Sequence, residues 1–365
     1  MAGHLCLDLT PALKGGWPHP GGLAEAGPLH FSCGGPVGNV GFALWRLGCP
    51  VRLVALVGDD RLGEIVIDCL RALGNQPGIR VVPGQTTSYS VVVAPKDCDR
   101  AFLHCAGANT VFTSKDVRDE DLHGAAWLHF GYPPLLPAIS AEGGRELATV
   151  FQRAKGSGLR TSLDFCTISS AAAEIDWRTV LQNCARSVTV FAPSIEELRV
   201  ALREPSRPDG EIDDVHSLAQ TLIGMGFTIV AIKLGTKGVY LATSDVGADL
   251  ERWGLGPEWG ARELMAPCFR ANFVNASGAG DCLIAGFIAS VAAGSGPEQA
   301  LTMAAAAGAA SAEAPDASSG VPSMAELQAR IAAGWERMDG SAPGGDWTFD
   351  PRLGVWNHAR QEAVR

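Results

Sequence analysis

The stretch Asn275-Ala276-Ser277-Gly278-Ala279-Gly280-Asp281 decides the predicted fold, because it joins a glycine-rich loop to an apolar run. Residues 283–291 repeat apolar side chains at helical spacing, so the loop is expected to lead into a helix. Glycines allow successive backbone N–H groups to face one space, and a helix N-terminus adds partial positive charge. The stretch therefore predicts an anion site that suits a phosphate group.

Asp281 lies at the end of this loop, where a carboxylate would repel a bound anion. Its presence there therefore suggests a role of its own. One such role is to accept a proton from a hydroxyl that attacks a phosphoryl group held by the loop. The alternative is a structural one, since an aspartate at a helix start commonly acts as the N-cap and glycines before it commonly form a turn. The heptapeptide alone leaves both roles open.

Composition narrows the class of protein. A chain of 365 residues suits one large domain with an appendage, and 47% hydrophobic content excludes general disorder. A net charge of -10 argues against nucleic acid as the main partner, although a nucleotide needs only local positive potential. The ten cysteines form no CxxC pair, and no leader or membrane-spanning segment is evident. These features predict a cytoplasmic protein with reduced thiols and no membrane partner.

Strands and helices are expected to alternate along most of the chain, which predicts an α/β fold. Short apolar runs predict buried strands, at residues 51–57, 126–130, 159–165, 188–191 and 228–234. Periodic segments predict helices, at residues 62–73, 143–155, 194–202, 215–224 and 297–312. Residues 86–94 and 101–105 predict a hairpin in a small separate sheet. Residues 245–266 are expected to form a long irregular insertion, and the aromatic residues after 341 are expected to dock on this subunit or a partner.

Other polar residues have positions that suit a ligand site. In Gly34-Gly35-Pro36-Val37-Gly38-Asn39 the glycines allow close approach of a ligand, and Asn39 could hydrogen-bond sugar hydroxyls. A tight turn with a capping asparagine is the alternative. Asp8 follows a short apolar run and is either a ligand contact or a turn former. Lys237, in Gly235-Thr236-Lys237-Gly238, could reach a phosphate or simply be solvated in a hairpin turn.

Three separated motifs together resemble the ribokinase-like (PfkB) carbohydrate kinases: Gly34-Gly35 with Asn39, Gly58-Asp59-Asp60 with Gly63, and Gly278-Ala279-Gly280-Asp281. The resemblance covers residues 4–322. It implies a Rossmann-like three-layer α/β/α domain over residues 1–322, with a small β-sheet lid whose strands come from residues 14–31 and 86–105. Residues 323–365 would add a C-terminal helix and the aromatic tail.

The family resemblance also implies an activity and roles for individual residues. The protein would be an ATP-dependent kinase acting on a hydroxyl of a small sugar or nucleoside, with Asp281 as general base. The anion hole would consist of the N–H groups of Ser277, Gly278, Ala279, Gly280 and Asp281. The acceptor would be bound by Asp8, Gly35, Asn39 and, as a weaker candidate, Asn109. The nucleotide side would use Gly235, Lys237, Gly238 and Ser277, and Glu197 would act indirectly on Mg²⁺ that bridges the ATP phosphates.

The chain departs from the family pattern at two motifs. The family usually has Asp-Thr where this chain has Asn275-Ala276, so the monovalent cation site that many members build there is doubtful. The usual Pro-Asn-x-x-Glu is present as Pro193-Ser194-Ile195-Glu196-Glu197, so magnesium handling is expected to be weaker or rearranged. These two changes motivate an alternative, a catalytically weak sugar- or nucleotide-binding protein that retains the kinase fold. The intact Asp281 favours the kinase.

The identity of the acceptor stays open among pseudouridine, adenosine, ribose, fructose and ketodeoxygluconate. The lid segments offer few basic residues, Lys14, Lys96 and Arg100, and an uncharged acceptor is therefore favoured. A homodimer formed through the lid sheets is expected by analogy with the family alone.

Overall fold

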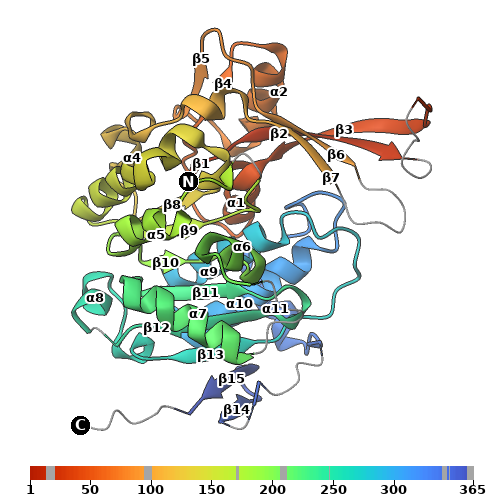
Figure 1. The fold of residues 1–365 in the computed structure, drawn as a ribbon. Helices are drawn as coiled ribbons and strands as arrows, with labels where there is room; N and C mark the ends of the chain where they lie inside the picture. Colours follow the sequence, from red (N-terminus) through yellow and green to blue (C-terminus); the bar gives the residue numbers. More distant parts are fainter. Residues whose placement is uncertain are drawn as a thin grey trace.

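The computed structural model describes residues 1–13, 21–93, 101–169, 172–205, 212–245, 247–338, 343–344 and 346–359. Two sheets organise these residues, a large sheet of nine strands and a separate sheet of four (Figure 1). The four-stranded sheet projects from one end of the large sheet, as Figure 1 shows at the upper right.

The large sheet is parallel in its first part and antiparallel in its second. Its strands, in spatial order, are β1 (Ala2–Gly3), β8 (Trp127–Gly131), β9 (Arg160–Asp164), β10 (Val190–Phe191), β11 (Ile229–Lys233), β12 (Val239–Thr243), β13 (Glu263–Ala266), β15 (Val355–His358) and β14 (Trp347–Asp350). Neighbours from β1 to β11 pair in parallel, and the remaining neighbours pair antiparallel. A parallel pair of strands, β4 (Ala55–Gly58) and β5 (Ile79–Val82), lies beside β1, because the Val54 N–H donates to the Met1 carbonyl at 2.8 Å.

Helices cover both faces of the large sheet, which confirms the predicted three-layer α/β/α fold. One face packs on α1 (Gly35–Arg46), α9 (Ala279–Ala292), α10 (Pro297–Ser311) and α11 (Met324–Ala332). The other face packs on α4 (Pro137–Gly156), α5 (Trp177–Ala185), α6 (Ile195–Leu202) and α7 (Ile212–Met225). Side chains of β11 alternate accordingly, with Ile229 and Ala231 in the first core and Val230 and Ile232 in the second.

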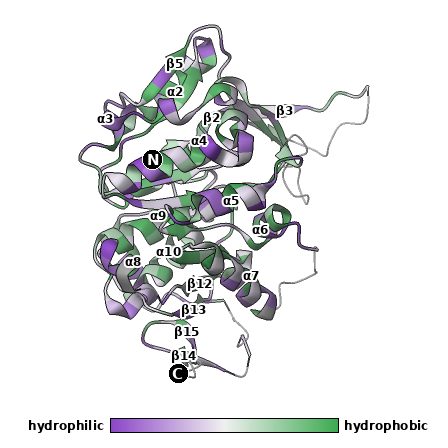
Figure 2. Ribbon diagram, turned by 60° about the vertical axis from the view of Figure 1, so that its left-hand side comes forward, coloured by the Kyte–Doolittle hydropathy of each residue, from purple (hydrophilic) through white to green (hydrophobic). Residues whose placement is uncertain are grey.

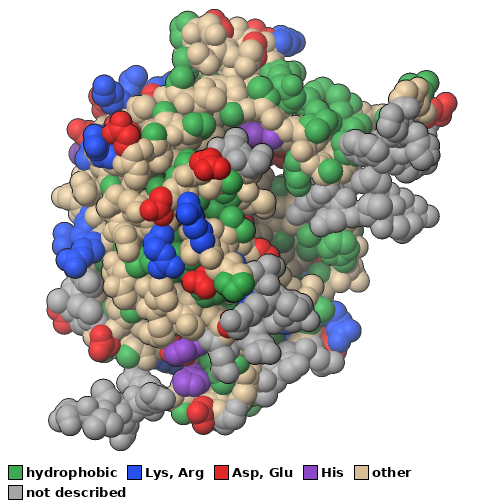
Figure 3. All heavy atoms as spheres, in the orientation of Figure 1, with side chains coloured by type: hydrophobic (Ala, Val, Ile, Leu, Met, Phe, Trp, Pro, Cys, Tyr) green, Lys and Arg blue, Asp and Glu red, His purple; other side chains and the backbone are tan. Residues whose placement is uncertain are grey.

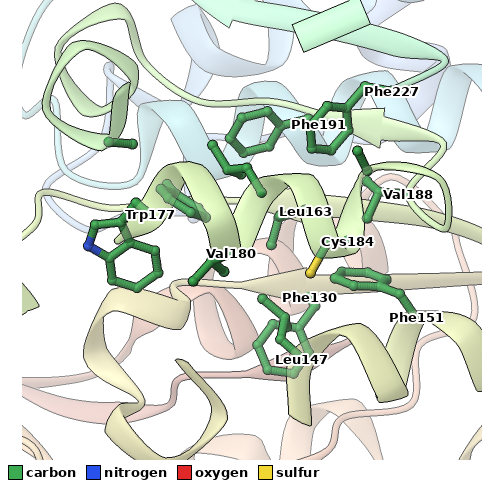
Figure 4. Close-up of a cluster of buried hydrophobic side chains, with 14 of the residues drawn as sticks. Phe130, Leu147, Phe151, Leu163, Trp177, Val180, Cys184, Val188, Phe191 and Phe227 are labelled. Atoms are coloured by element: carbon green, nitrogen blue, oxygen red, sulfur yellow. The ribbon is translucent and has the colours of Figure 1, made fainter. Parts of the chain in front are cut away.

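The two cores differ in the side chains that fill them. Aromatic rings from β8, β10 and α4 fill the core beneath α5, as the close-up in Figure 4 shows. Alanines fill the core between α9 and α10, and both helices are mostly hydrophobic (Figure 2). Small side chains let these two helices approach closely: a Cβ on Gly286 would lie 2.6 Å from the Met303 carbonyl oxygen. This packing fixes the N-terminus of α9 relative to the sheet.

The lid sheet contains β3 (Ala26–Gly34), β2 (Cys6–Leu13), β6 (Tyr89–Val93) and β7 (Ala101–Cys105) in that spatial order. The predicted hairpin of β6 and β7 is confirmed. The lid also includes residues 6–13, which the sequence prediction left out of it, because β2 pairs with β3 and β6. Residues 14–20 of the expected lid segment, the turn at 94–100, and hence Lys14, Lys96 and Arg100, lie outside the described residues.

The Gly58-Asp59-Asp60 motif connects the lid to the rest of the fold. The Asp60 carboxylate caps α2 (Arg61–Leu70) by accepting the Gly63 N–H at 2.9 Å. It also accepts the Thr87 N–H at 2.8 Å, just before β6 begins. A Cβ on Gly58 would lie 2.3 Å from the Gln85 carbonyl oxygen, so only glycine fits at this approach. The motif is therefore structural and holds the base of the lid.

The prediction of an irregular insertion at residues 245–266 was wrong. These residues form α8 (Gly247–Arg252), a short turn and β13, which lies between β12 and β15. Trp259 is 1% exposed, and burial of this ring anchors the segment. The aromatic tail docks on this subunit, which is one of the two alternatives expected from the sequence. β15 pairs with β13, and the Trp347 ring packs on Tyr240 with ring centroids 6.1 Å apart.

Candidate active site

Asp281 lies in the first turn of α9, and its side chain is buried, with the residue 2% exposed. The Asn39 amide on α1 donates to its Oδ2 at 2.8 Å. The Tyr132 hydroxyl, just after β8, donates to its Oδ1 at 2.9 Å. The N-cap of α9 is Gly278, and no side chain caps this helix. The alternative in which Asp281 is an N-cap is therefore wrong, and its carboxylate is held in one orientation by partners from two distant elements.

The environment of Asp281 makes its carboxylate a stronger base than an exposed aspartate. Burial raises the pKa of Asp281 above its ordinary value. The hydrogen bond from Asn39, the positive charge of Lys233 and the hydrogen bond from Tyr132 oppose this increase and favour the ionised form. The carboxylate is thus able to accept a proton from a hydroxyl placed beside it.

The loop before α9 presents free N–H donors, although fewer than the sequence suggested. The Ser277 N–H donates to Asn275 Oδ1 at 2.9 Å, and the Ala279 N–H donates to the Ala276 carbonyl at 3.2 Å. Among the described residues, the N–H groups of Gly278, Gly280 and Asp281 have no hydrogen-bond partner. These three donors at a helix N-terminus suit an anion.

Asp8 and Gly35 lie together where the lid meets α1. A Cβ on Gly34 would lie 2.3 Å from Asp8 Oδ2, and a Cβ on Gly35, whose φ is +75°, would lie 2.4 Å from His4 Nδ1. Glycines therefore let this backbone approach the two polar side chains. Burial raises the pKa of Asp8 to about 6, and the Cys6 thiol donates to its Oδ1 at 3.4 Å.

His4 is a polar side chain that the sequence analysis did not identify. It is 2% exposed, and neither ring nitrogen has a hydrogen-bond partner among the described residues. Its ring lies 5.1 Å from the His104 ring of the lid and 6.3 Å from the Tyr132 ring, centroid to centroid. Burial lowers the pKa of His4 to about 3, so the imidazole is neutral. It offers one donor and one acceptor to a bound ligand.

The remaining candidate residues lie in several places. Lys237 is exposed in the short turn Gly235–Lys237 between β11 and β12, and Gly238 ends this turn with φ +108°, directly before β12. Glu197 Oε2 accepts the Ser194 N–H at 2.7 Å in the capping box of α6. Asn109 is fully buried and donates to the Leu5 carbonyl at 3.0 Å, a contact that supports the strand leading to the lid.

Comparison with known proteins identifies the family of this chain. The family model described as pfkB family carbohydrate kinase matches residues 2–324. The chain belongs to this family.

This pfkB-family kinase is similar to named sugar kinases over most of its length. It is 25% identical over 276 residues to the deoxyribokinase of Salmonella typhi, covering 74% of this chain and 78% of that protein. It is 26% identical over 334 residues to the 2-dehydro-3-deoxygluconokinase of Bacillus subtilis, covering 86% of this chain and 90% of that protein. An E. coli protein described as a ribokinase II, in complex with ATP and Mg²⁺, superposes on this chain with a TM-score of 0.68. It is 20% identical to this chain, and the match covers 91% of this chain and 98% of that chain.

Besides His4, three residues of this kinase's candidate site were not predicted as site residues. Tyr132, Asp164 and Lys233 come from the carboxyl ends of β8, β9 and β11, the edge at which ligands bind in open α/β sheets. Tyr132 has a φ of +61°, which is costly for a non-glycine residue and is typical of functional sites. The available signal was a polar residue at the end of a predicted strand, as at Asp164 in 159–165 and Lys233 in 228–234.

None of the helices among the described residues combines the length and the apolar character needed to cross a lipid bilayer.

Proposed function

We propose that this pfkB-family kinase transfers the γ-phosphoryl group of ATP to a hydroxyl of an uncharged small sugar or nucleoside, with Asp281 as the general base. The observation that carries the proposal is the buried Asp281 carboxylate beside the free N–H groups of Gly278, Gly280 and its own backbone. A base for the attacking hydroxyl and an anion hole for the transferring group are thus adjacent.

The proposed reaction is an in-line displacement at the γ-phosphorus. The hydroxyl oxygen of the acceptor forms a bond to phosphorus as the bond to the β,γ-bridging oxygen breaks, and ADP leaves. The hydroxyl proton passes to the Asp281 carboxylate. Asn39 and Tyr132 are positioning residues, since their hydrogen bonds of 2.8 and 2.9 Å orient the carboxylate. This departs from the sequence prediction, in which Asn39 contacts the acceptor directly.

The residues present fit Mg²⁺ that is held mainly by the phosphates. Among the described residues, no group of three or more acidic, histidine or cysteine side chains is placed to hold a metal ion directly. Asp164 Oδ2 is buried without a partner and Glu197 lies nearby, 3.9 Å from Lys233 Nζ, so the site carries excess negative charge. Mg²⁺ would supply charge neutralisation on the triphosphate, and Glu197 is proposed to act on it indirectly.

The lining of the acceptor side supports an uncharged substrate. Asp8 and Asp281 are both acidic, and the charge of Asp281 is one of the effects that raise the pKa of Asp8. Burial lowers the pKa values of His4 and His104, so neither ring supplies positive charge at neutral pH. No lysine or arginine of the described chain forms an ion pair with Asp8. A carboxylate or phosphate on the acceptor would be repelled.

The test is ADP release from ATP in a panel of acceptors: ribose, deoxyribose, fructose, adenosine, pseudouridine, ketodeoxygluconate and a sugar phosphate. The expected result is turnover with one or more uncharged acceptors and none with the two anionic ones. Turnover restricted to an anionic acceptor would contradict the uncharged class. Ligand-induced thermal stabilisation without turnover by any acceptor would support a catalytically weak binding protein instead.

Acceptor affinity is expected to fall as the pH decreases through about 6, the raised pKa of Asp8. Below this pH Asp8 becomes protonated and loses the charge that strengthens its hydrogen bonds to hydroxyls, so KM for the acceptor rises. The measurement is KM for the acceptor at saturating ATP as a function of pH between about 5 and 8. This range extends about one pH unit or more on each side of the transition. Asp8→Asn is expected to raise KM at neutral pH and to remove this dependence. A pH profile of KM that is unchanged in Asp8→Asn would contradict the role.

Activity is expected to be independent of potassium. The Asn275 amide donates to the Pro315 carbonyl at 2.9 Å and accepts the Ser277 N–H at 2.9 Å, so it already bridges the two backbone segments. Replacing K⁺ by tetramethylammonium should leave kcat unchanged. Asn275→Asp puts a carboxylate beside the Pro315 carbonyl, and this variant should lose activity and regain it with K⁺. Strong potassium activation of the unaltered protein would contradict this expectation.

A homodimer through the lid stays a prediction. Leu29, Phe31 and Leu103 of the lid sheet are 47%, 49% and 60% exposed, and hydrophobic side chains gather over the lid in Figure 3. Exposed apolar area of this kind supports association.

A further inference from the structure

Lys233 is a buried cation at the edge of the active site whose role the proposed function leaves open. It is the last residue of β11 and is 8% exposed. Its Nζ donates to Asp164 Oδ1 at 2.7 Å and lies 3.9 Å from Glu197 Oε2. Burial alone would lower the pKa of Lys233, but the facing carboxylates raise it, so the ammonium stays charged.

The ammonium has donor capacity that its protein partners do not use. Lysine carries three N–H donors, and among the described residues only the Asp164 contact lies within hydrogen-bond distance. Leaving buried donors without acceptors is unfavourable, so a buried ammonium of this kind suits a site that an anionic ligand completes.

Lys233 also lies against the anion-hole loop. A Cβ on Gly280 would be 3.4 Å from Lys233 Nζ and 3.3 Å from its Cδ. The Gly280 N–H is one of the three free donors of the loop, and glycine at this position keeps the space between loop and ammonium open. Asp164 and Glu197 fix the lysine from β9 and α6, so its position is set before any ligand binds.

We infer that Lys233 is a catalytic residue that donates a hydrogen bond to an oxygen of the transferring phosphoryl group. The inference rests on the proposed function and deepens it. Lys233 keeps its proton throughout, while the hydroxyl proton passes to Asp281 and ADP leaves. Its fixed charge stabilises the negative charge that the phosphoryl oxygens carry in the transition state.

The alternative is that Lys233 only holds β9 and α6 together. Lys233→Met alone cannot distinguish the two roles, because it leaves Asp164 as an unpaired buried carboxylate and destabilises the fold. The informative comparison is Asp164→Asn with Asp164→Asn/Lys233→Met. The double variant removes both charges, and Lys233→Gln in the same Asp164→Asn background provides a second readout should the methionine variant not fold.

The expected result is that kcat per folded molecule falls by about 10²–10³-fold from Asp164→Asn to the double variant, as for loss of an oxyanion donor. KM for the acceptor should change little, since the inferred contact of Lys233 is with the transferring phosphoryl group and not with the acceptor. The matched control is Arg80→Met/Asp121→Asn, which removes another ion pair, 2.6 Å long with side chains 16% and 6% exposed. This control should lower the melting temperature and leave kcat unchanged.

A double variant whose kcat equals that of Asp164→Asn would overturn the inference and show that Lys233 is structural. Asp281→Asn, assayed in parallel, separates this result from failure of the proposed function. If Asp281→Asn is inactive while the double variant is fully active, only the role of Lys233 is wrong. If Asp281→Asn is itself active, the proposed mechanism fails, and the role of Lys233 in it fails as well.

Discussion

Asp281→Asn is expected to lower kcat by about 10²–10⁴-fold, the usual contribution of a general base. The amide has nearly the same size as the carboxylate but cannot accept the hydroxyl proton. KM for the acceptor and the melting temperature should change less than kcat, because the amide oxygen can still accept from Asn39 while the amide N–H donates to the Tyr132 hydroxyl oxygen. Steady-state kinetics with ADP detection, together with thermal unfolding, checks this result.

The control for Asp281→Asn is Asp176→Asn, a substitution at a true helix cap. Asp176 accepts the Thr179 N–H at the start of α5, far along the chain from the proposed site. This variant should lose some stability and keep its kcat. Near-normal kcat in Asp281→Asn would rule out Asp281 as the base.

The pH dependence of kcat provides a second test of Asp281. Burial raises the pKa of this carboxyl, so it becomes protonated at a higher pH than an exposed aspartate. Only the ionised form accepts a proton, and kcat should therefore fall as the pH decreases through this raised pKa. An acid limb that persists unchanged in the residual activity of Asp281→Asn would assign the titration to another group.

Gly278→Ala is expected to cause the second large effect. Gly278 has a φ of +72°, and a Cβ there would lie 2.5 Å from the Ala317 Cβ. The substitution adds about 1–2 kcal/mol of backbone strain and displaces the loop. Because the free N–H groups then lose their alignment, kcat should fall by about 10²–10³-fold and KM for ATP should rise.

Gly294→Ala separates the effect on the site from the cost of strain. Gly294 follows the other end of α9 with a φ of +86°, and a Cβ there would have no neighbour within 4 Å. It should show a similar loss of stability from strain and no loss of kcat. If both variants lose activity equally, the geometry of the loop at Gly278 is not what matters.

Local sequence was sufficient to predict the loop at residues 275–281 and the helix after it. Glycine geometry, helical periodicity and helix polarity act over a few residues, so these features are readable from a short stretch. The helix predicted at residues 194–202 is likewise confirmed, and Ser194 with Glu197 forms a capping box at its start. The hairpin of β6 and β7 was also predicted, from alternating and β-branched residues on either side of a turn, and the pairing confirms it.

Contacts between distant segments were not readable in this way. The hydrogen bonds of Asp281 to Asn39 and Tyr132 span 242 and 149 residues. Residues 263–266 form a strand inside the large sheet although the sequence suggested an irregular insertion, because β12 and β15 supply its backbone partners. Residues 6–13 join the lid because β3 and β6 pair with them.

The sequence by itself determined the class of fold, the family and the glycine-rich loop at the start of α9, since each depends on residue types at fixed short spacing. Only the tertiary structure decided which side chains surround that loop. The parallel strands β8, β9 and β11 end at one edge of the sheet and bring Tyr132, Asp164 and Lys233 to the N-terminus of α9. Burial there changes the pKa values of Asp281 and Lys233, which is an effect of packing that no local pattern encodes.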